Sequence, residues 1–155
     1  MDAKNRPDVE KLEQIECWHL LESHVLARLA VVVDGHPDIF PVNYVVDNRS
    51  VVFRTASGTK FLGALESTPV AMEIDGYDSH TELAWSVVLR GAAREVRRQE
   101  ELSNASVAYL DPWQGGPKEH VIRVNTLNLS GRRFKVTKPE IWKTPLSDPR
   151  RASFE

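Results

Sequence analysis

The sequence predicts a mainly β protein built as a closed or partly closed antiparallel barrel with flanking helices. Short β-prone segments recur along the 155 residues, and turn signals such as GHP and NRS separate them. Helical patterns occur only between some of these segments, whereas a doubly wound parallel sheet would alternate strand and helix regularly. A chain of this length suits one domain with a substantial core.

The first third of the chain is predicted to hold one helix and a β-meander. Asp8 can cap a helix through VEKLEQIECWHLLESH, where apolar residues return at helical spacing. Over residues 25–55 the period becomes strand-like, in VLARLAVVVD, DIFPVNYVVD and VVFRT. We therefore expect three consecutive antiparallel strands.

The remaining elements follow from shorter signals. SGTKFLGALES predicts a helix that Ser57 can cap, and TPVAMEIDG predicts a strand. ELAWSVVLRGAAREV predicts a long strand, in which Gly91 indicates a bulge or a barrel corner. RRQEELSNASVAYL predicts a further helix, and EHVIRVNTLNLSGRRFKV predicts two strands that meet near Ser130 and Gly131. Residues 1–137 thus form a single domain, and 138–155, rich in proline and charge, an extended tail.

Composition limits the partners and the compartment. The formal net charge is −2, which argues against nucleic acid as a partner. The N-terminal stretch is polar and no apolar run has the length of a membrane span, so we expect a cytoplasmic protein without a membrane partner. Cys17 is the one cysteine, and it is not spaced with His19 and His24 as metal ligands are, so we expect no metal.

The segment VVFRTASGTKF points to an anion site. Arg54, Thr55, Ser57 and Lys60 lie between the end of a strand and the start of a helix. Two cations, hydroxyls and helix-entry amides suit a phosphate monoester. Neither a P-loop nor a G-x-G-x-x-G pattern is present. The alternative is that Arg54 and Lys60 are solvated surface charges and Ser57 is only a helix cap.

The strand IFPVNYVV has two faces, neither of them cleanly polar. One carries Phe40, Val42, Tyr44 and Val46, and the other carries Ile39, Pro41, Asn43 and Val45. One face is expected to lie on the barrel core and the other on a partner subunit or a flat ligand. Pro41 lacks an amide hydrogen, which indicates an edge or a strand approached by something other than another strand.

The stretch LARLAVVVDGHPDIFPVNYVVDNRSVVFRTASGTKFLGAL resembles the pyridoxamine 5′-phosphate oxidase-like flavoproteins, the FMN-binding split-barrel superfamily. The pattern combines G-x-P-x-x-x-P-V-N-Y, then R-T, then a Gly-Thr-Lys loop that leads into a helix. The later AWSVVLRGAAREV is similar to another strand of these proteins. The resemblance covers roughly residues 17–136.

This resemblance implies a six-stranded antiparallel Greek-key split barrel. It also implies a homodimer with one FMN in each of two clefts between the barrels. The phosphate would be held by Arg54, Thr55, Ser57 and Lys60, and the isoalloxazine ring would lie along Pro41–Tyr44, with backbone groups of Val42 and Asn43 at its polar edge. The implied cofactor-binding residues are Pro41, Val42, Asn43, Tyr44, Arg54, Thr55, Ser57, Lys60, Trp85 and Ser86. Ser86 stands where the true oxidases carry glutamine.

The implied function is an FMN-dependent oxidoreductase that acts on a small molecule by hydride or electron transfer at the flavin. LNLSGRRFKVTKPEIWK does not show the C-terminal motif of the true oxidases, so vitamin B6 oxidation is not expected. Three alternatives stay open: a non-catalytic flavin-binding or redox-sensing protein, an F420-dependent reductase or a heme binder on the same fold, and a ligand-free barrel whose basic C-terminal edge binds a protein or RNA. No catalytic residue is assigned, and His80 is either a proton donor or an exposed loop histidine.

Overall fold

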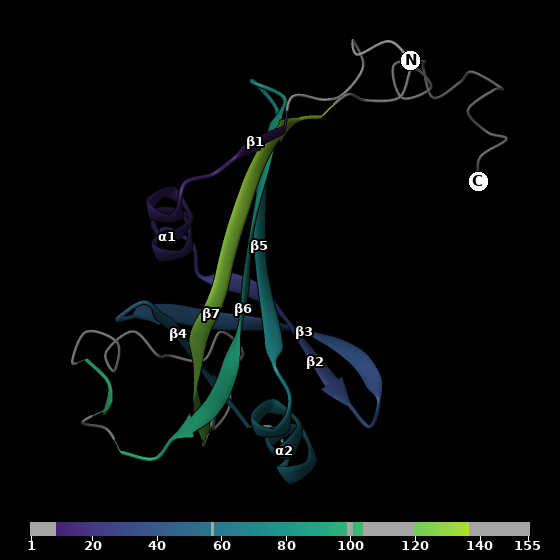
Figure 1. Cartoon of the computed structure of the whole chain (residues 1–155), viewed down its shortest axis with the longest axis vertical. Helices are drawn as coiled ribbons and strands as arrows, with labels where there is room; N and C mark the ends of the chain where they lie inside the picture. The colour runs from purple at the N-terminus through teal and green to yellow at the C-terminus, as the bar shows by residue number, and fades with distance from the viewer. Residues whose placement is uncertain (1–8, 57, 99–100, 104–119, 137–155) are drawn as a thin grey trace, which may run out of the picture.

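The computed structural model describes residues 9–56, 58–98, 101–103 and 120–136 (Figure 1). The predicted helix in RRQEELSNASVAYL, the tail 138–155, Asp8 and Ser57 therefore lie wholly or mostly outside the described residues. The elements are β1 (Val9–Lys11), α1 (Gln14–Glu22), β2 (Leu26–Val33), β3 (His36–Asp47), β4 (Ser50–Thr55), α2 (Thr59–Ser67), β5 (Val70–Asp78), β6 (Leu83–Val96) and β7 (His120–Lys135).

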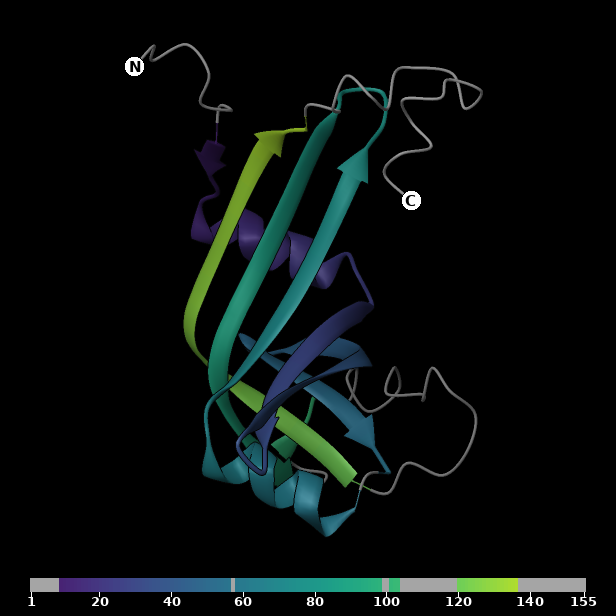
Figure 2. The same cartoon turned by 90° about the vertical axis from the view of Figure 1, so that its right-hand side faces the viewer.

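Six of the strands close into an antiparallel barrel. Pairing runs β7–β4–β3–β2–β5–β6 and returns from β6 to β7, which confirms the predicted mainly β barrel. Strand β1 pairs with the end of β7 as a seventh strand. β5, β6 and β7 extend beyond the barrel as a long arm, along which α1 lies, while α2 covers the opposite end of the barrel (Figures 1 and 2).

Two tight hairpins produce the predicted meander. Val33 pairs with His36 across a two-residue turn in which Asp34 and Gly35 both have positive φ, 52° and 75°. This is a type I′ turn, whose twist matches that of the flanking strands and which favours Asp-Gly. Asn48 and Arg49 form the corresponding turn between β3 and β4.

The N-terminal helix is shorter than predicted. It begins at Gln14 with Glu13 in the cap position, and Val9–Lys11 forms β1 instead. Val9 pairs with Phe134 in β7, so the hydrogen bonds of the sheet override the helical spacing of the local sequence. The cap position of α2 is Gly58, one residue after the predicted Ser57.

The prediction of two strands meeting near Gly131 is wrong, because β7 is one continuous strand of 16 residues. Gly131 makes no turn. A Cβ there would lie 2.7 Å from Cys17 Sγ, so the missing side chain lets α1 pack closely on the arm. The bulge predicted at Gly91 is confirmed by a register shift between Arg90 and Gly91.

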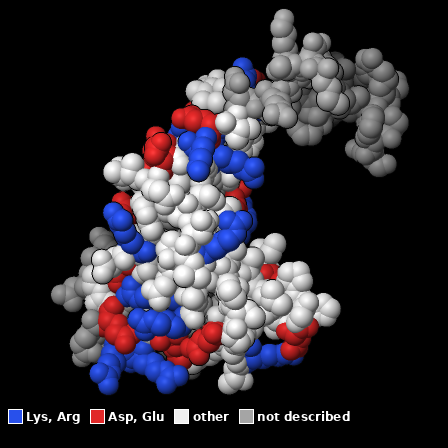
Figure 3. All heavy atoms as spheres, in the orientation of Figure 1, with Lys and Arg blue, Asp and Glu red and all other residues white. Residues whose placement is uncertain are grey.

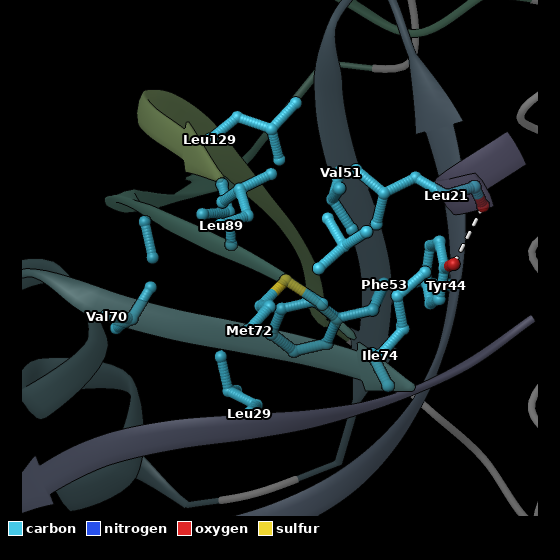
Figure 4. Close-up of a cluster of buried hydrophobic side chains, with 14 of the residues drawn as sticks. Leu21, Leu29, Tyr44, Val51, Phe53, Val70, Met72, Ile74, Leu89 and Leu129 are labelled. Atoms are coloured by element: carbon cyan, nitrogen blue, oxygen red, sulfur yellow. Dashed lines mark hydrogen bonds between the residues drawn. The ribbon is translucent and has the colours of Figure 1, made fainter. Parts of the chain in front are cut away.

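The barrel core is filled by large apolar side chains from every strand of the meander and from β5 to β7 (Figure 4). Phe53, Met72 and Leu89 are among those with less than 2% of their surface exposed. Tyr44 is buried with them, and its hydroxyl donates a hydrogen bond of 2.7 Å to the carbonyl of Leu21 (Figure 4). Neither of the two described α-helices is long and apolar enough to span a membrane.

Candidate functional site

The predicted residues of β3 divide between two faces of the strand. Val42 and Tyr44 face the barrel core, where Tyr44 is packed and hydrogen-bonded. Pro41 is exposed and Asn43 is half-buried on the outer face. The side chains of Val42 and Tyr44 therefore contribute to packing, whereas those of Pro41 and Asn43 lie on the side where a ligand or partner can approach.

The backbone N–H and C=O groups of β3 alternate between the two edges of the strand. The Tyr44 N–H donates to the Val25 carbonyl at 3.0 Å, so the alternation of an antiparallel ladder directs the backbone groups of even-numbered residues toward β2. The backbone groups of Pro41 and Asn43 face the other edge of β3, whereas the backbone groups of Val42 face β2. The recorded pairing of β3 with β4 starts at Tyr44 and Phe53, which sets Asn43 opposite Arg54, and Pro41 lies beyond the paired stretch of this edge. Pro41 thus sits where its missing N–H costs no ladder hydrogen bond.

Arg54 extends this outer face onto β4. Tyr44 is paired with Phe53, which places Asn43 opposite Arg54 one step further along, and Leu26 of β2 is paired with Asn43 on its other side. Directly opposed residues share a face with Cβ atoms about 4.5–5.5 Å apart. Arg54 is exposed, whereas the neighbouring Thr55 is buried and points the other way. Asn43 and Arg54 are therefore brought together, and Thr55 is not part of this row.

Ser86 belongs to the same outer face and Trp85 does not. Arg28 of β2 is paired with Pro41 of β3 on one side and with Glu73 of β5 on the other. Asp75 lies two residues beyond Glu73, on the same face of β5, and is paired with Ser86 of β6. Trp85 points to the opposite side of β6. It packs against the core and meets the His24 ring edge-on, with ring centroids 4.8 Å apart.

Lys60 lies in the first turn of α2, where its ammonium group contacts the carboxylate of Asp34 in the β2–β3 turn. Both side chains are largely exposed, 70% and 62%. Sequence reasoning missed Asp34, because Asp-Gly is explained fully by the turn it forms. The pair borders a hollow of about 300 Å³ between this turn and α2. Its lining residues are Val32, Val33, Asp34, Gly35, Lys60, Ala64, Ser67 and Thr68.

A second ionic group on the outer face was also missed. Arg28 Nη1 lies 3.2 Å from Glu73 Oε2 and 3.2 Å from Asp75 Oδ1. Burial, together with the neighbouring charge of Asp75, raises the pKa of Glu73. On the face seen in Figure 3 cations and anions are interspersed, without a field of one sign. The local arrangement of charges, rather than a global field, would therefore select an anionic ligand.

His80, the candidate proton donor, is exposed in the turn between β5 and β6. Its backbone N–H is bonded to Asp78 Oδ1 at 2.8 Å, as in many Asx turns. This position explains the histidine as part of a turn, and its catalytic role stays a prediction.

A six-stranded split barrel with an exposed row on β3 and Arg54 beside it on β4 defines the structural class. Comparison with known proteins gives the family: the family model described as pyridoxamine 5′-phosphate oxidase matches residues 13–133. The chain belongs to this family, and the resemblance inferred from the motifs is confirmed.

Individual relatives agree with this assignment. A solved structure described as the FAD binding protein from Mycobacterium smegmatis is 43% identical and has a TM-score of 0.68, over 81% of this chain and 98% of that one. A Corynebacterium glutamicum structure, named provisionally as a pyridoxamine 5′-phosphate oxidase, is 33% identical with a TM-score of 0.73, over 90% and 99%. The Mycobacterium tuberculosis protein Rv0080, which is uncharacterised, is 30% identical over 82% of this chain and 86% of its own.

Proposed function

We propose that this protein is a flavin-binding oxidoreductase that acts on a small molecule. The observation that carries the proposal is the outer row formed by Pro41, Asn43 and Arg54, with Ser86 on the same face. It offers an exposed strand surface that includes Pro41, with the cation of Arg54 at one end. The family and the FAD-binding relative of 43% identity support the same ligand class.

The proposed ligand is a flavin nucleotide, either FMN, as the motifs imply, or FAD, which the M. smegmatis relative is described as binding. Both carry the isoalloxazine ring and a phosphate at the end of a ribityl chain. The deazaflavin F420 is the remaining candidate, and its longer acidic tail calls for more cations than Arg54 and Lys60 provide. The hollow beside Lys60, about 300 Å³, is at the lower limit for small-molecule sites, so the ring is assigned to the outer face of β3.

When bound, the flavin supplies hydride and electron transfer. The protein's own part is then binding and orientation. Arg54 would hold the phosphate through charge-assisted hydrogen bonds, and Pro41 would pack on the ring. The half-buried Asn43 would border the ring on the same face. No side chain of the chain has to act as a nucleophile in such a site.

We propose further that a second copy of the chain covers this face. Leu26 and Val32 on β2 and Ile39 on β3 are exposed by 42%, 44% and 71%, and all three lie on the outer side. An exposed apolar patch of this kind marks an interaction surface. Light scattering after size-exclusion chromatography should give twice the chain mass. Ile39→Asp should yield monomers with weaker flavin binding, and a monomeric wild-type protein would refute the dimer.

The phosphate assignment is tested by Arg54→Ala with Lys135→Ala as the matched control. Lys135 is exposed at the far end of β7, away from His120, which pairs with Thr55. Loss of a charge-assisted hydrogen bond costs about 1.5–3 kcal/mol, so flavin should bind Arg54→Ala more weakly by about 10- to 150-fold. Titrations of each variant with FMN and FAD, followed by flavin fluorescence, measure this. Equal affinities in the two variants would rule out Arg54 as the phosphate ligand.

Enzymatic activity needs its own assay. Reduction of the bound flavin by NADH or NADPH, followed by turnover of an added electron acceptor, supports the oxidoreductase. Tight flavin binding with neither reduction nor turnover would favour the non-catalytic or redox-sensing alternative.

A further inference from the structure

The face of the arm that points away from α1 carries two neighbouring cations. Lys11 of β1 is paired with Arg132 of β7, and Arg132 is paired with Ser86 of β6 on its other side. Directly opposed residues of an antiparallel pair share a face with Cβ atoms about 4.5–5.5 Å apart, and like charges at such positions repel. Both side chains are exposed. The surface of the arm therefore holds an unfavourable pair of positive charges.

In the described part of the chain, no carboxylate forms an ion pair with either of these two cations. Glu10 follows the alternation of β1 to the opposite face, where it lies 3.4 Å from Arg133 Nη1. Asp75 shares the row of Arg132, but β6 separates the two, and an arginine of β2 holds this carboxylate at 3.2 Å. The charge of Arg133 is thus compensated, whereas the charges of Lys11 and Arg132 are not.

An apolar row adjoins the two cations on the same face. Two residues nearer the tip of the arm, Tyr77, Ala84, Phe134 and Val9 are paired in turn across β5, β6, β7 and β1. Tyr77 and Val9 are 47% and 57% exposed. Helix α1 packs against the other face of the arm, at Gly131, and lies behind β5, β6 and β7 in Figure 2. Residues two apart along a strand are separated by about 7 Å, so an exposed apolar surface lies close to the cations.

We propose that Lys11, Arg132, Tyr77 and Val9 form a binding site, the arm site, for an organic anion that carries an apolar or aromatic group. The phosphate or carboxylate of this ligand lies between Lys11 and Arg132, where it removes their repulsion. The planar guanidinium of arginine matches the geometry of both kinds of anion. The apolar group packs on Tyr77, about 7 Å further along the arm. None of these four residues is assigned to the flavin, so the arm site goes beyond the proposed function and does not depend on it.

Phenyl phosphate is the probe for this site, because it joins an aromatic ring to a phosphate, and inorganic phosphate and phenol each supply one half of it. Titrations of the full chain followed by amide NMR give both the dissociation constant and the place of binding. Phenyl phosphate should bind more tightly than either half, with the largest shifts around Lys11, Tyr77 and Arg132. Tyr77→Ala should weaken the binding of phenyl phosphate and leave that of inorganic phosphate unchanged.

The charge is tested by Arg132→Ala with Lys135→Ala as the matched control. Lys135 is an exposed cation of the same strand, three residues from Arg132 and on the opposite face. Arg132→Ala should weaken the binding of phenyl phosphate by about 3- to 10-fold, the range between an exposed ion pair and a charge-assisted hydrogen bond. Lys135→Ala should leave it unchanged, and so should Arg54→Ala, which removes the cation proposed for the flavin.

The repulsion gives a second readout that needs no ligand. In thermal unfolding at low salt, Arg132→Ala should be at least as stable as Lys135→Ala, because it removes one of two opposed like charges. Added phenyl phosphate should raise the melting temperature of the wild-type protein and of Lys135→Ala more than that of Arg132→Ala.

Several results would overturn the inference. Equal affinities of the wild-type protein and Arg132→Ala, an equal loss in Lys135→Ala, or shifts centred on Arg54 would each show that the probe does not bind at the arm site. A dimeric wild-type protein that becomes monomeric in both Arg132→Ala and Tyr77→Ala would show that a second copy of the chain, rather than an organic anion, covers this face. The proposed function stands in each case, because it is tested by flavin binding and Arg54→Ala.

Discussion

Replacing Asp47 by alanine should destabilise the barrel strongly, because it leaves a buried arginine without its counter-charge. Asp47 ends β3, and its Oδ2 accepts hydrogen bonds from Arg123 Nη2 at 3.1 Å and from the Ser103 N–H at 3.2 Å. Arg123 also donates to the carbonyl of Glu101 at 2.6 Å. The pair thus joins two strands of the barrel to residues 101–103.

The expected magnitude follows from burial. The side chains of Arg123 and Asp47 are only 9% and 7% exposed, so water cannot replace the lost partner. Breaking a buried ion pair on one side costs about 3–5 kcal/mol. For a domain of this size that corresponds to a melting temperature lower by roughly 6–20 °C. This is a large part of the stability of an ordinary domain, about 5–15 kcal/mol.

Urea unfolding followed by circular dichroism measures the free energy, at one fixed flavin concentration for all variants. Ser50→Ala removes a hydroxyl that donates to the Asp47 carbonyl and accepts from Arg123 Nη1 but leaves both charges in place, so it should cost less, about 1.5–3 kcal/mol. The double variant Asp47→Leu with Arg123→Met should lose less than the sum of the two single changes, because no charge is left buried. A loss below 1 kcal/mol in Asp47→Ala would refute the reasoning.

Two further predictions concern the core. Gly91→Ala should destabilise the barrel by about 2–4 kcal/mol, because its Cβ would overlap the backbone carbonyl of Asn125, and thermal unfolding that matches wild type would contradict this. Burial raises the pKa of Tyr44, so the folded state keeps a proton that the unfolded state loses above about pH 10. The free energy of unfolding should therefore fall by up to about 1.4 kcal/mol per pH unit above that point, and Tyr44→Phe should remove this part of the decline. Parallel pH profiles of wild type and Tyr44→Phe would refute the assignment.

The meander was predictable because its signals are local. The turn signals GHP and NRS mark the two hairpins to within a residue or two. The turns themselves are formed by Asp34-Gly35 and Asn48-Arg49, between β-branched runs whose alternation fixes the register. The bulge at Gly91 followed from a glycine within a long strand. Gly131 looks the same in sequence, yet its role is to admit Cys17 of a helix more than a hundred residues away along the chain. Such contacts between distant segments leave no local signal.

The candidate site was predictable in its segments but not in its side-chain directions. Pro41 and Arg54 came from motifs that did not say which face of the barrel they would occupy, and both lie on the outer face. Trp85 and Ser86 are adjacent in sequence, so strand alternation sends them to opposite faces, and the motif alone did not say which one faces outward. The contact between Asp34 and Lys60 joins a hairpin turn to a helix, and only the closed barrel brings them together.

The central claim, a flavin held on the outer face of β3, is tested most directly by the visible spectrum of the purified protein. The chromophore is then released, identified by mass and matched to FMN or FAD. The account predicts flavin absorption bands in the wild-type protein, as purified or after reconstitution, and their loss or marked weakening in Arg54→Ala at equal protein concentration. A colourless wild-type protein that takes up neither FMN nor FAD when they are added would contradict it.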